Sequence, residues 1–249
     1  MAMFEQDSWK RYKDEMVLHC REFSPELCQV LENDQLHVAV RNAMSRAANH
    51  GFTNRGPIRL FIEMMLLFGT GFDNDPQYPR FMQILAGEND QMIRADQLYN
   101  EVVQYQKEVS GDNGVNTMKA YRRLLSLSSR TMHFSEDSFQ PDMIHGMAEV
   151  FPEKASYLGV NALGNLIRKG TGIAAGAGIP MGRGHALLVW LMYMMGHECC
   201  SDPLYPWISA TLNSQGMKDA ETRTHRLEQK CITWLNQVLI NFSPIDQNE

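Results

Sequence analysis

Apolar residues recur at three-and-four spacing along much of the chain, which is the period of one face of an α-helix. The segment 36–50 places Val40, Ala43 and Ala47 on one such face, and it is followed directly by Gly51. Glycine is common just after a helix because it adopts positive φ without strain. We therefore expect an amphipathic helix that ends before Gly51.

Two further segments are apolar on nearly every side, as central helices of an all-helical protein are. The segment 57–68 begins with Pro57, which suits a first helical turn, and it stops at Gly69. The run 186–195 stops at Gly196 and is far shorter than the roughly 20 residues that cross a bilayer. Both segments are predicted to be buried helices, and no membrane span is expected.

Helical patterns also cover the segments 92–109, 118–127 and 220–239, and the glycine-rich stretch 110–114 indicates a loop. No segment alternates apolar and polar residues with the period of a strand. The pattern therefore predicts an all-α fold. One predicted helix, 162–177, contains three glycines, which destabilise a helix by about 1 kcal/mol each; it is either broken or unusually tightly packed.

An internal repeat organises these helices, because Asp75-Pro-Gln-Tyr-Pro79 recurs as Asp202-Pro-Leu-Tyr-Pro206, 127 positions later. The same offset pairs Gly69 with Gly196 and extends back, without a gap, toward residue 16. We predict an internal duplication that gives two pseudo-symmetric helical lobes. The matched positions are Gly69, Asp75, Pro76, Gly196, Asp202 and Pro203.

The lobe boundary is placed at the pattern break 135–141. Lobe 1 would comprise residues 1–134, which hold the first repeat copy and connecting helices. Lobe 2 would comprise residues 135–249, which hold the second copy, a closing helix and a polar tail. In each copy the Asp-Pro pair is interpreted as a helix N-cap followed by a preorganised first helical residue.

Composition adds that the protein is an ordinary globular chain of 249 residues with 44% hydrophobic residues. Its formal net charge is 23 minus 29, or −6, and its basic residues are scattered. Nucleic acid is therefore not an expected partner. Five cysteines without framework spacing and a charged N-terminal segment favour a cytoplasmic protein with reduced thiols.

Candidate chemistry in the sequence is sparse, and we predict no cofactor, no metal and no catalytic residues. His185, His197, Cys199 and Cys200 are metal-ligand types, but their spacing fits neither a structural zinc site nor a helical zinc-protease motif. The Asp73–Asp75 triplet lacks the alternating ligands of a calcium loop. Neither a nucleophile elbow nor a phosphate loop is present. Whether the histidine and cysteine group has a metal or redox role stays open.

The matched repeat tips are the strongest candidates for a binding surface, since each places an aromatic residue after Asp-Pro. They suggest an aromatic and polar ridge of the kind enriched at protein interfaces. The candidate partner-binding residues are Phe72, Asp73, Tyr78, Arg80, Tyr205 and Trp207. The alternative is intramolecular: the loops could pack the two lobes together around a pseudo-twofold axis.

The stretch 45–79 resembles a family of uncharacterised bacterial proteins encoded in type VI secretion clusters, beside VgrG and PAAR spike genes and effector genes. The resemblance rests on an Ala-rich helix, Gly51-Phe-Thr53, an apolar helix ending at Gly69, and Phe72-Asp-Asn-Asp-Pro76. Residues 196–207 are similar to the C-terminal half of that family. The family has no catalytic motif to carry over, so the resemblance implies a context and not a reaction.

That context implies a cytoplasmic, non-enzymatic adaptor or chaperone that holds a secreted effector or a spike component before loading. One alternative is an immunity protein that neutralises a cognate toxin, for which an acidic surface could complement a basic toxin domain. A second is an enzyme or effector whose site is not visible in sequence. The adaptor is preferred, because a framework shared beside varied effectors suits a shared loading step.

Overall fold

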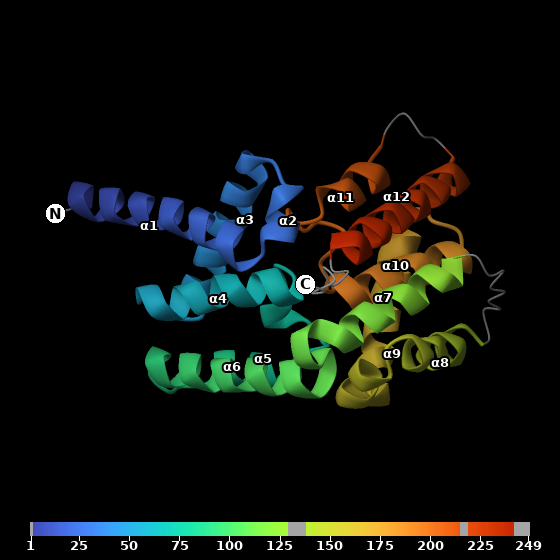
Figure 1. The fold of residues 1–249 in the computed structure, drawn as a ribbon, viewed down its shortest axis with the longest axis horizontal. Helices are drawn as coiled ribbons and strands as arrows, with labels where there is room; N and C mark the ends of the chain where they lie inside the picture. Colours follow the sequence, from blue (N-terminus) through green and yellow to red (C-terminus); the bar gives the residue numbers. More distant parts are fainter. Residues whose placement is uncertain (1, 129–137, 215–218, 242–249) are drawn as a thin grey trace, which may run out of the picture. The chain divides into compact units, whose positions relative to one another are not determined.

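The computed structural model describes residues 2–128, 138–214 and 219–241, and these residues form helices joined by turns (Figure 1). Within them the all-α prediction is confirmed. The α-helices are α1 (Ala2–Phe23), α2 (Pro25–Gln29), α3 (Asn33–Asn49), α4 (Arg55–Phe68), α5 (Pro79–Leu85), α6 (Gln91–Tyr105), α7 (Val115–Ser128), α8 (Phe139–Val150), α9 (Pro152–Gly176), α10 (Arg183–Met195), α11 (Pro206–Leu212) and α12 (Ala220–Asn241). Shorter helical turns are η1 (Phe72–Asn74), η2 (Gln106–Ser110) and η3 (Asp112–Gly114).

The chain divides into two compact units that do not follow its order. Unit 1 contains Met1–Val102 and Met195–Pro206, and unit 2 contains Val103–Met194 and Trp207–Glu249. The predicted lobe boundary between residues 134 and 135 lies outside the described residues. The units differ from the predicted lobes in two respects. The chain from Val103 through α7, predicted to belong to lobe 1, is part of unit 2, and the loop at 196–205, which belongs to the second repeat copy, is part of unit 1.

The core of unit 1 is built on α3 and α4, which end where the sequence predicts. The last turn of α3 is followed by Gly51 at φ +75°, and α4 ends at its C-cap Gly69. An aromatic cluster fills the core, with the rings of Phe61 and Phe72 centred 4.6 Å apart and those of Phe68 and Phe81 centred 5.0 Å apart. This cluster fixes the loop after α4 against the helix that precedes it.

The core of unit 2 is built on α8, α9 and α10. As predicted, α10 is a largely buried helix, with Leu188, Val189 and Met192 inside the core. The predicted glycine-rich segment 162–177 forms the unbroken second part of α9 and is tightly packed, because a Cβ on Gly170 would lie only 2.7 Å from a methyl of Val189. The break in α9 lies before that segment, at Gly159 with φ +72°. Among the described residues, no helix is both long and apolar enough to span a membrane.

Candidate functional site

Two loops at matched positions of the repeat are bonded to each other inside unit 1. We call residues 69–78 and 196–205 the paired loops. Each loop contributes a buried carboxylate that accepts a backbone hydrogen bond from the other loop. Asp202 Oδ2 accepts from the Thr70 N–H at 2.8 Å, and Asp75 Oδ2 accepts from the His197 N–H at 2.8 Å. Thr70 and His197 are 127 positions apart, as are the two aspartates. The sequence offset therefore coincides with equivalent hydrogen bonds.

The same two carboxylates also stabilise their own loops, so they are not the helix caps that the sequence suggested. The second oxygen of Asp75 accepts from the Gln77 N–H at 2.9 Å, and that of Asp202 accepts from the Leu204 N–H at 2.8 Å. The following helices, α5 and α11, begin later, at the second proline of each motif. The Asp-Pro pairs thus form turns, because bonding across to the other loop holds each aspartate away from a helix N-terminus.

Glycine is required where the paired loops approach most closely. Gly69 and Gly196 adopt φ of +91° and +97°. A Cβ on Gly69 would lie 2.6 Å from the carbonyl oxygen of Met195, and one on Gly196 would lie 2.5 Å from that of Phe68. Both obstacles are backbone atoms, which cannot rotate away. The two glycines therefore permit the loops to meet.

A buried imidazole extends this network on one side. The His197 side chain is fully buried, with Nδ1 3.1 Å from Asp75 Oδ2 and Nε2 3.5 Å from Glu198 Oε1. The hydrogen bond to His197 and the charge of Arg46 lower the pKa of Glu198 to about 2. Burial raises the pKa of Asp202 to about 6, although the hydrogen bonds from Thr70 and Leu204 oppose this shift.

Arg46, from α3, ties two carboxylates of the paired loops together. Its Nε donates to Asp73 Oδ1 at 2.9 Å and its Nη1 to Glu198 Oε2 at 3.0 Å, while His50 Nε2 lies 2.9 Å from Asp73 Oδ2. Burial opposes ionisation of Asp73, but the bonds from His50 and Arg46 outweigh it and lower the pKa of that carboxyl. One guanidinium thus bridges two carboxylates within unit 1, which is the arrangement of a structural network.

The candidate metal or redox group is distributed over different elements. His197 lies in the paired loops of unit 1, whereas His185 is buried in unit 2 with Nε2 3.0 Å from the Ile179 carbonyl oxygen. Burial raises the pKa of the Cys199 thiol, which disfavours its thiolate, whereas the hydrogen bond with Cys199 lowers the pKa of Cys200. Over the parts of the chain that the structure describes, no group of three or more His, Cys, Asp or Glu side chains is arranged to hold a metal ion.

The predicted aromatic ridge is not formed, because its rings are needed in the core. Phe72, Tyr78 and Tyr205 are buried. Tyr78 packs against Phe81, with ring centroids 5.2 Å apart. Of the remaining candidates, Asp73 belongs to the Arg46 network, Arg80 is exposed and bonds Glu101 at 3.1 Å, and Trp207 is half-buried. Within unit 1 the two loops bond to each other, and the three buried rings face the core.

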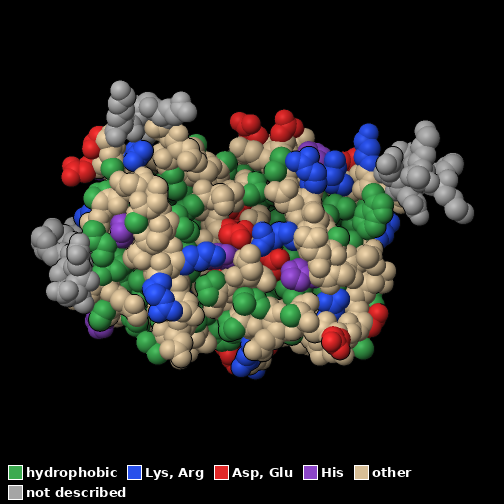
Figure 2. All heavy atoms as spheres, turned by 180° about the vertical axis from the view of Figure 1, so that it is seen from behind, with side chains coloured by type: hydrophobic (Ala, Val, Ile, Leu, Met, Phe, Trp, Pro, Cys, Tyr) green, Lys and Arg blue, Asp and Glu red, His purple; other side chains and the backbone are tan. Residues whose placement is uncertain are grey.

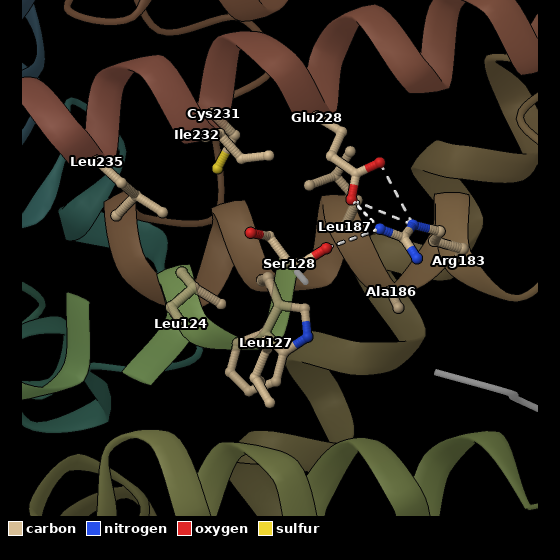
Figure 3. Close-up of a pocket in the computed structure, with 11 residues that line it drawn as sticks. Leu124, Leu127, Ser128, Arg183, Ala186, Leu187, Glu228, Cys231, Ile232 and Leu235 are labelled. Atoms are coloured by element: carbon tan, nitrogen blue, oxygen red, sulfur yellow. Dashed lines mark hydrogen bonds and ion pairs between the residues drawn. The ribbon is translucent and has the colours of Figure 1, made fainter. Parts of the chain in front are cut away.

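A different site, which the sequence did not suggest, lies in unit 2. An apolar pocket of about 70 Å³ opens between α7, α10 and α12 (Figure 3). Its apolar lining residues are Leu124, Leu127, Ala186, Leu187, Trp190, Cys231, Ile232 and Leu235. We call this pocket, together with the trough beside it, the α7–α10–α12 groove.

The rim of the pocket carries an ion pair that Figure 3 shows with dashed lines. Arg183 Nε donates to the Glu228 carboxylate at 3.1 Å. Arg183 Nη2 donates both to the same carboxylate and to the Ser128 carbonyl oxygen, the latter at 3.3 Å. The pair joins α10 to α12 at the point where the apolar pocket ends. Arg183 is thus already engaged by one anion and one carbonyl group.

Beyond this rim the groove continues as a trough of about 540 Å³, whose lining mixes charged, polar and apolar side chains. The trough shares Ser128, Arg183, Glu228 and Ile232 with the pocket, so the two form one continuous depression. Its further lining residues are Pro180, Met181, Gly184, Glu221, Thr224, His225 and Gln229. One signal of the groove exists in the sequence, namely the helical spacing of its α12 residues, but that spacing does not tell which helices lie opposite.

One face of the molecule mixes charges of both signs. On the face shown in Figure 2, acidic, basic and histidine side chains are interspersed with apolar and neutral ones. Comparisons of the chain with protein-family models, with curated proteins and with solved structures gave no match. The functional argument therefore depends on the residues and geometry of the chain itself.

Proposed function

We propose that the protein is a non-enzymatic adaptor that holds a segment of a partner protein in the α7–α10–α12 groove. The observation that carries this proposal is the apolar pocket of unit 2 with the trough that continues it. Binding energy at protein interfaces is concentrated where an apolar side chain enters such a pocket and polar groups surround it. At about 70 Å³ the apolar pocket suits one inserted side chain, and the trough of about 540 Å³ beside it has room for neighbouring residues of the same segment.

The paired loops support the same proposal indirectly. Their carboxylates and Arg46 are bonded to one another, and each bond joins elements of unit 1. We also infer that the two loops descend from the internal duplication with an offset of 127 residues, which the equivalent bonds of Asp75 and Asp202 support. In this proposal, the duplicated elements provide the scaffold and the groove provides the binding surface.

The resemblance to proteins of type VI secretion clusters suggests the biological context. We propose that the partner is a secreted effector or a VgrG or PAAR spike component, held in the bacterial cytoplasm before loading. An immunity protein would use the same kind of groove on a toxin domain. The two roles differ in which part of the partner is bound, and a crosslink can locate that part.

Site-specific photo-crosslinking in the native bacterium tests the proposal. Benzoylphenylalanine placed at Ile232, inside the groove, should crosslink a discrete protein. The same residue placed at Ile240, which is 72% exposed on the same helix but outside the groove, should not. Mass spectrometry then maps the attached peptide.

Crosslinks to a spike component or to the N-terminal region of an effector would support the adaptor. Crosslinks confined to a toxin domain would identify an immunity protein instead. Equal crosslinking from the two positions, or none from the groove, would contradict a binding role for this site.

A further inference from the structure

We infer that the groove takes a short partner segment with a basic end and one leucine-sized apolar anchor. This inference rests on the proposed function, because it names the chemistry of the partner at the same site. It follows from the way in which one face of α12 changes character along its length. The anchor would enter the pocket, and the basic end would lie along the trough.

The residues of α12 that line the groove form a single stripe. Glu221, His225, Glu228, Ile232 and Leu235 are spaced by four, three, four and three residues, which places them on one helical face. At 1.5 Å per residue the stripe is about 21 Å long. Its first part is polar and carries two carboxylates, while its second part is apolar. The bound segment is therefore expected to place basic residues beside the carboxylates and an apolar residue beside the apolar part of the stripe.

The apolar end of the stripe is closed by side chains from two other helices. Leu127 of α7 and Leu187 and Trp190 of α10 line the pocket together with Ile232. The volume of about 70 Å³ accommodates one aliphatic side chain rather than an extended hydrocarbon. Leucine, isoleucine or methionine is thus the expected anchor, and burying it removes apolar surface from water.

The charges around the trough select a cation over an anion. The single guanidinium among the described lining residues, Arg183, is paired with Glu228 and also bonds the Ser128 carbonyl oxygen. An anionic ligand, such as a fatty acid, would have to displace Glu228 from it. A lysine or arginine instead meets a second carboxylate, Glu221, which is exposed in the first turn of α12. Charge complementarity therefore favours a basic segment.

Three labelled synthetic octapeptides test this specificity. An extended octapeptide spans the stripe, since about six residues at 3.3 Å each cover 21 Å. The first carries two lysines at one end and a leucine at the other, the second has glutamates in place of the lysines, and the third has alanine in place of the leucine. Fluorescence anisotropy with the full chain should show the first binding about tenfold more tightly than either other peptide. Added salt should weaken it.

Paired variants assign the binding to the groove. Ile232→Ser should weaken binding of the lysine–leucine peptide about tenfold, whereas Ile240→Ser on the same helix should leave it unchanged. Glu221→Gln should weaken binding about threefold, and Glu149→Gln, at an exposed position of α8, should not. Because Glu221 is exposed, its variant removes a charge without opening the core. Circular dichroism melts establish that each variant is folded.

Similar affinity for all three peptides, no measurable binding of the first, or indifference to Ile232→Ser would overturn the inference. So would sedimentation that shows a dimer lost in Ile232→Ser, since a second copy of the chain would then be the occupant. Groove crosslinks in the cell without this peptide preference would leave the proposed function standing and refute the named chemistry. Peptide preference without groove crosslinks would refute the proposed function.

Discussion

The contact between the paired loops makes a sharp prediction for Gly69→Ala. Gly69 has φ +91° and ψ 158°, a backbone region that only glycine adopts without strain, and forcing alanine into it costs roughly 1–3 kcal/mol. The added Cβ would also lie 2.6 Å from the Met195 carbonyl oxygen, and relieving such an overlap costs about 1–3 kcal/mol more. We therefore expect Gly69→Ala to lower the free energy of unfolding by about 4 kcal/mol, a large part of the 5–15 kcal/mol typical of a domain.

Urea unfolding followed by circular dichroism measures this loss, and amide hydrogen exchange at Thr70 and His197 localises it to the paired loops. The matched control is Gly172→Ala. Gly172 lies in α9 at negative φ with nothing within 4 Å of the added Cβ, so this change should stabilise the protein by about 0.5–1 kcal/mol. If Gly69→Ala cost less than about 1 kcal/mol, the close approach of the loops described above would be wrong.

Three further predictions concern buried groups. Burial raises the pKa of Asp202 to about 6 from an unfolded value of 3.8. The contribution of this group to stability is therefore fully present below pH 3.8 and is lost as the pH rises through 6. Asp202→Asn should remove about 3 kcal/mol of pH dependence from unfolding curves measured between pH 4 and 7. Arg46→Met should cost about 2 kcal/mol in urea unfolding, because it leaves two partly buried carboxylates without their shared cation. Gly170→Ala should lower the melting temperature, since its Cβ would press on Val189 and cost about 1–3 kcal/mol.

The sequence by itself determined the helical class and several helix ends. Apolar residues at helical spacing, with no strand period, require helices to bury one face. Gly69 and Gly196 mark the ends of α4 and α10, because positive φ after a helix is readily available only to glycine. These features depend on residues near one another in the chain. They were therefore predictable without knowledge of distant contacts.

Only the tertiary structure decided what the matched tips do. The sequence suggested that Asp75 and Asp202 cap helices and that Tyr78 and Tyr205 face a partner. Instead, each aspartate accepts a backbone hydrogen bond from a loop more than 120 residues away in the chain, and both tyrosines are buried. The local pattern Asp-Pro fits a cap and a turn equally well, and the distant donor selects the turn.

The groove likewise exists only because three distant segments meet. The lining of its apolar pocket comes from residues 124–128 of α7, 183–190 of α10 and 228–235 of α12, none of which carries a recognisable motif. The stripe on α12 can be read from its spacing alone, but the same spacing would describe a helix buried against any neighbour. Whether this face of α12 is open for binding depends on how far α7 and α10 lie from it. That distance is set by the packing of the helices and not by the local sequence.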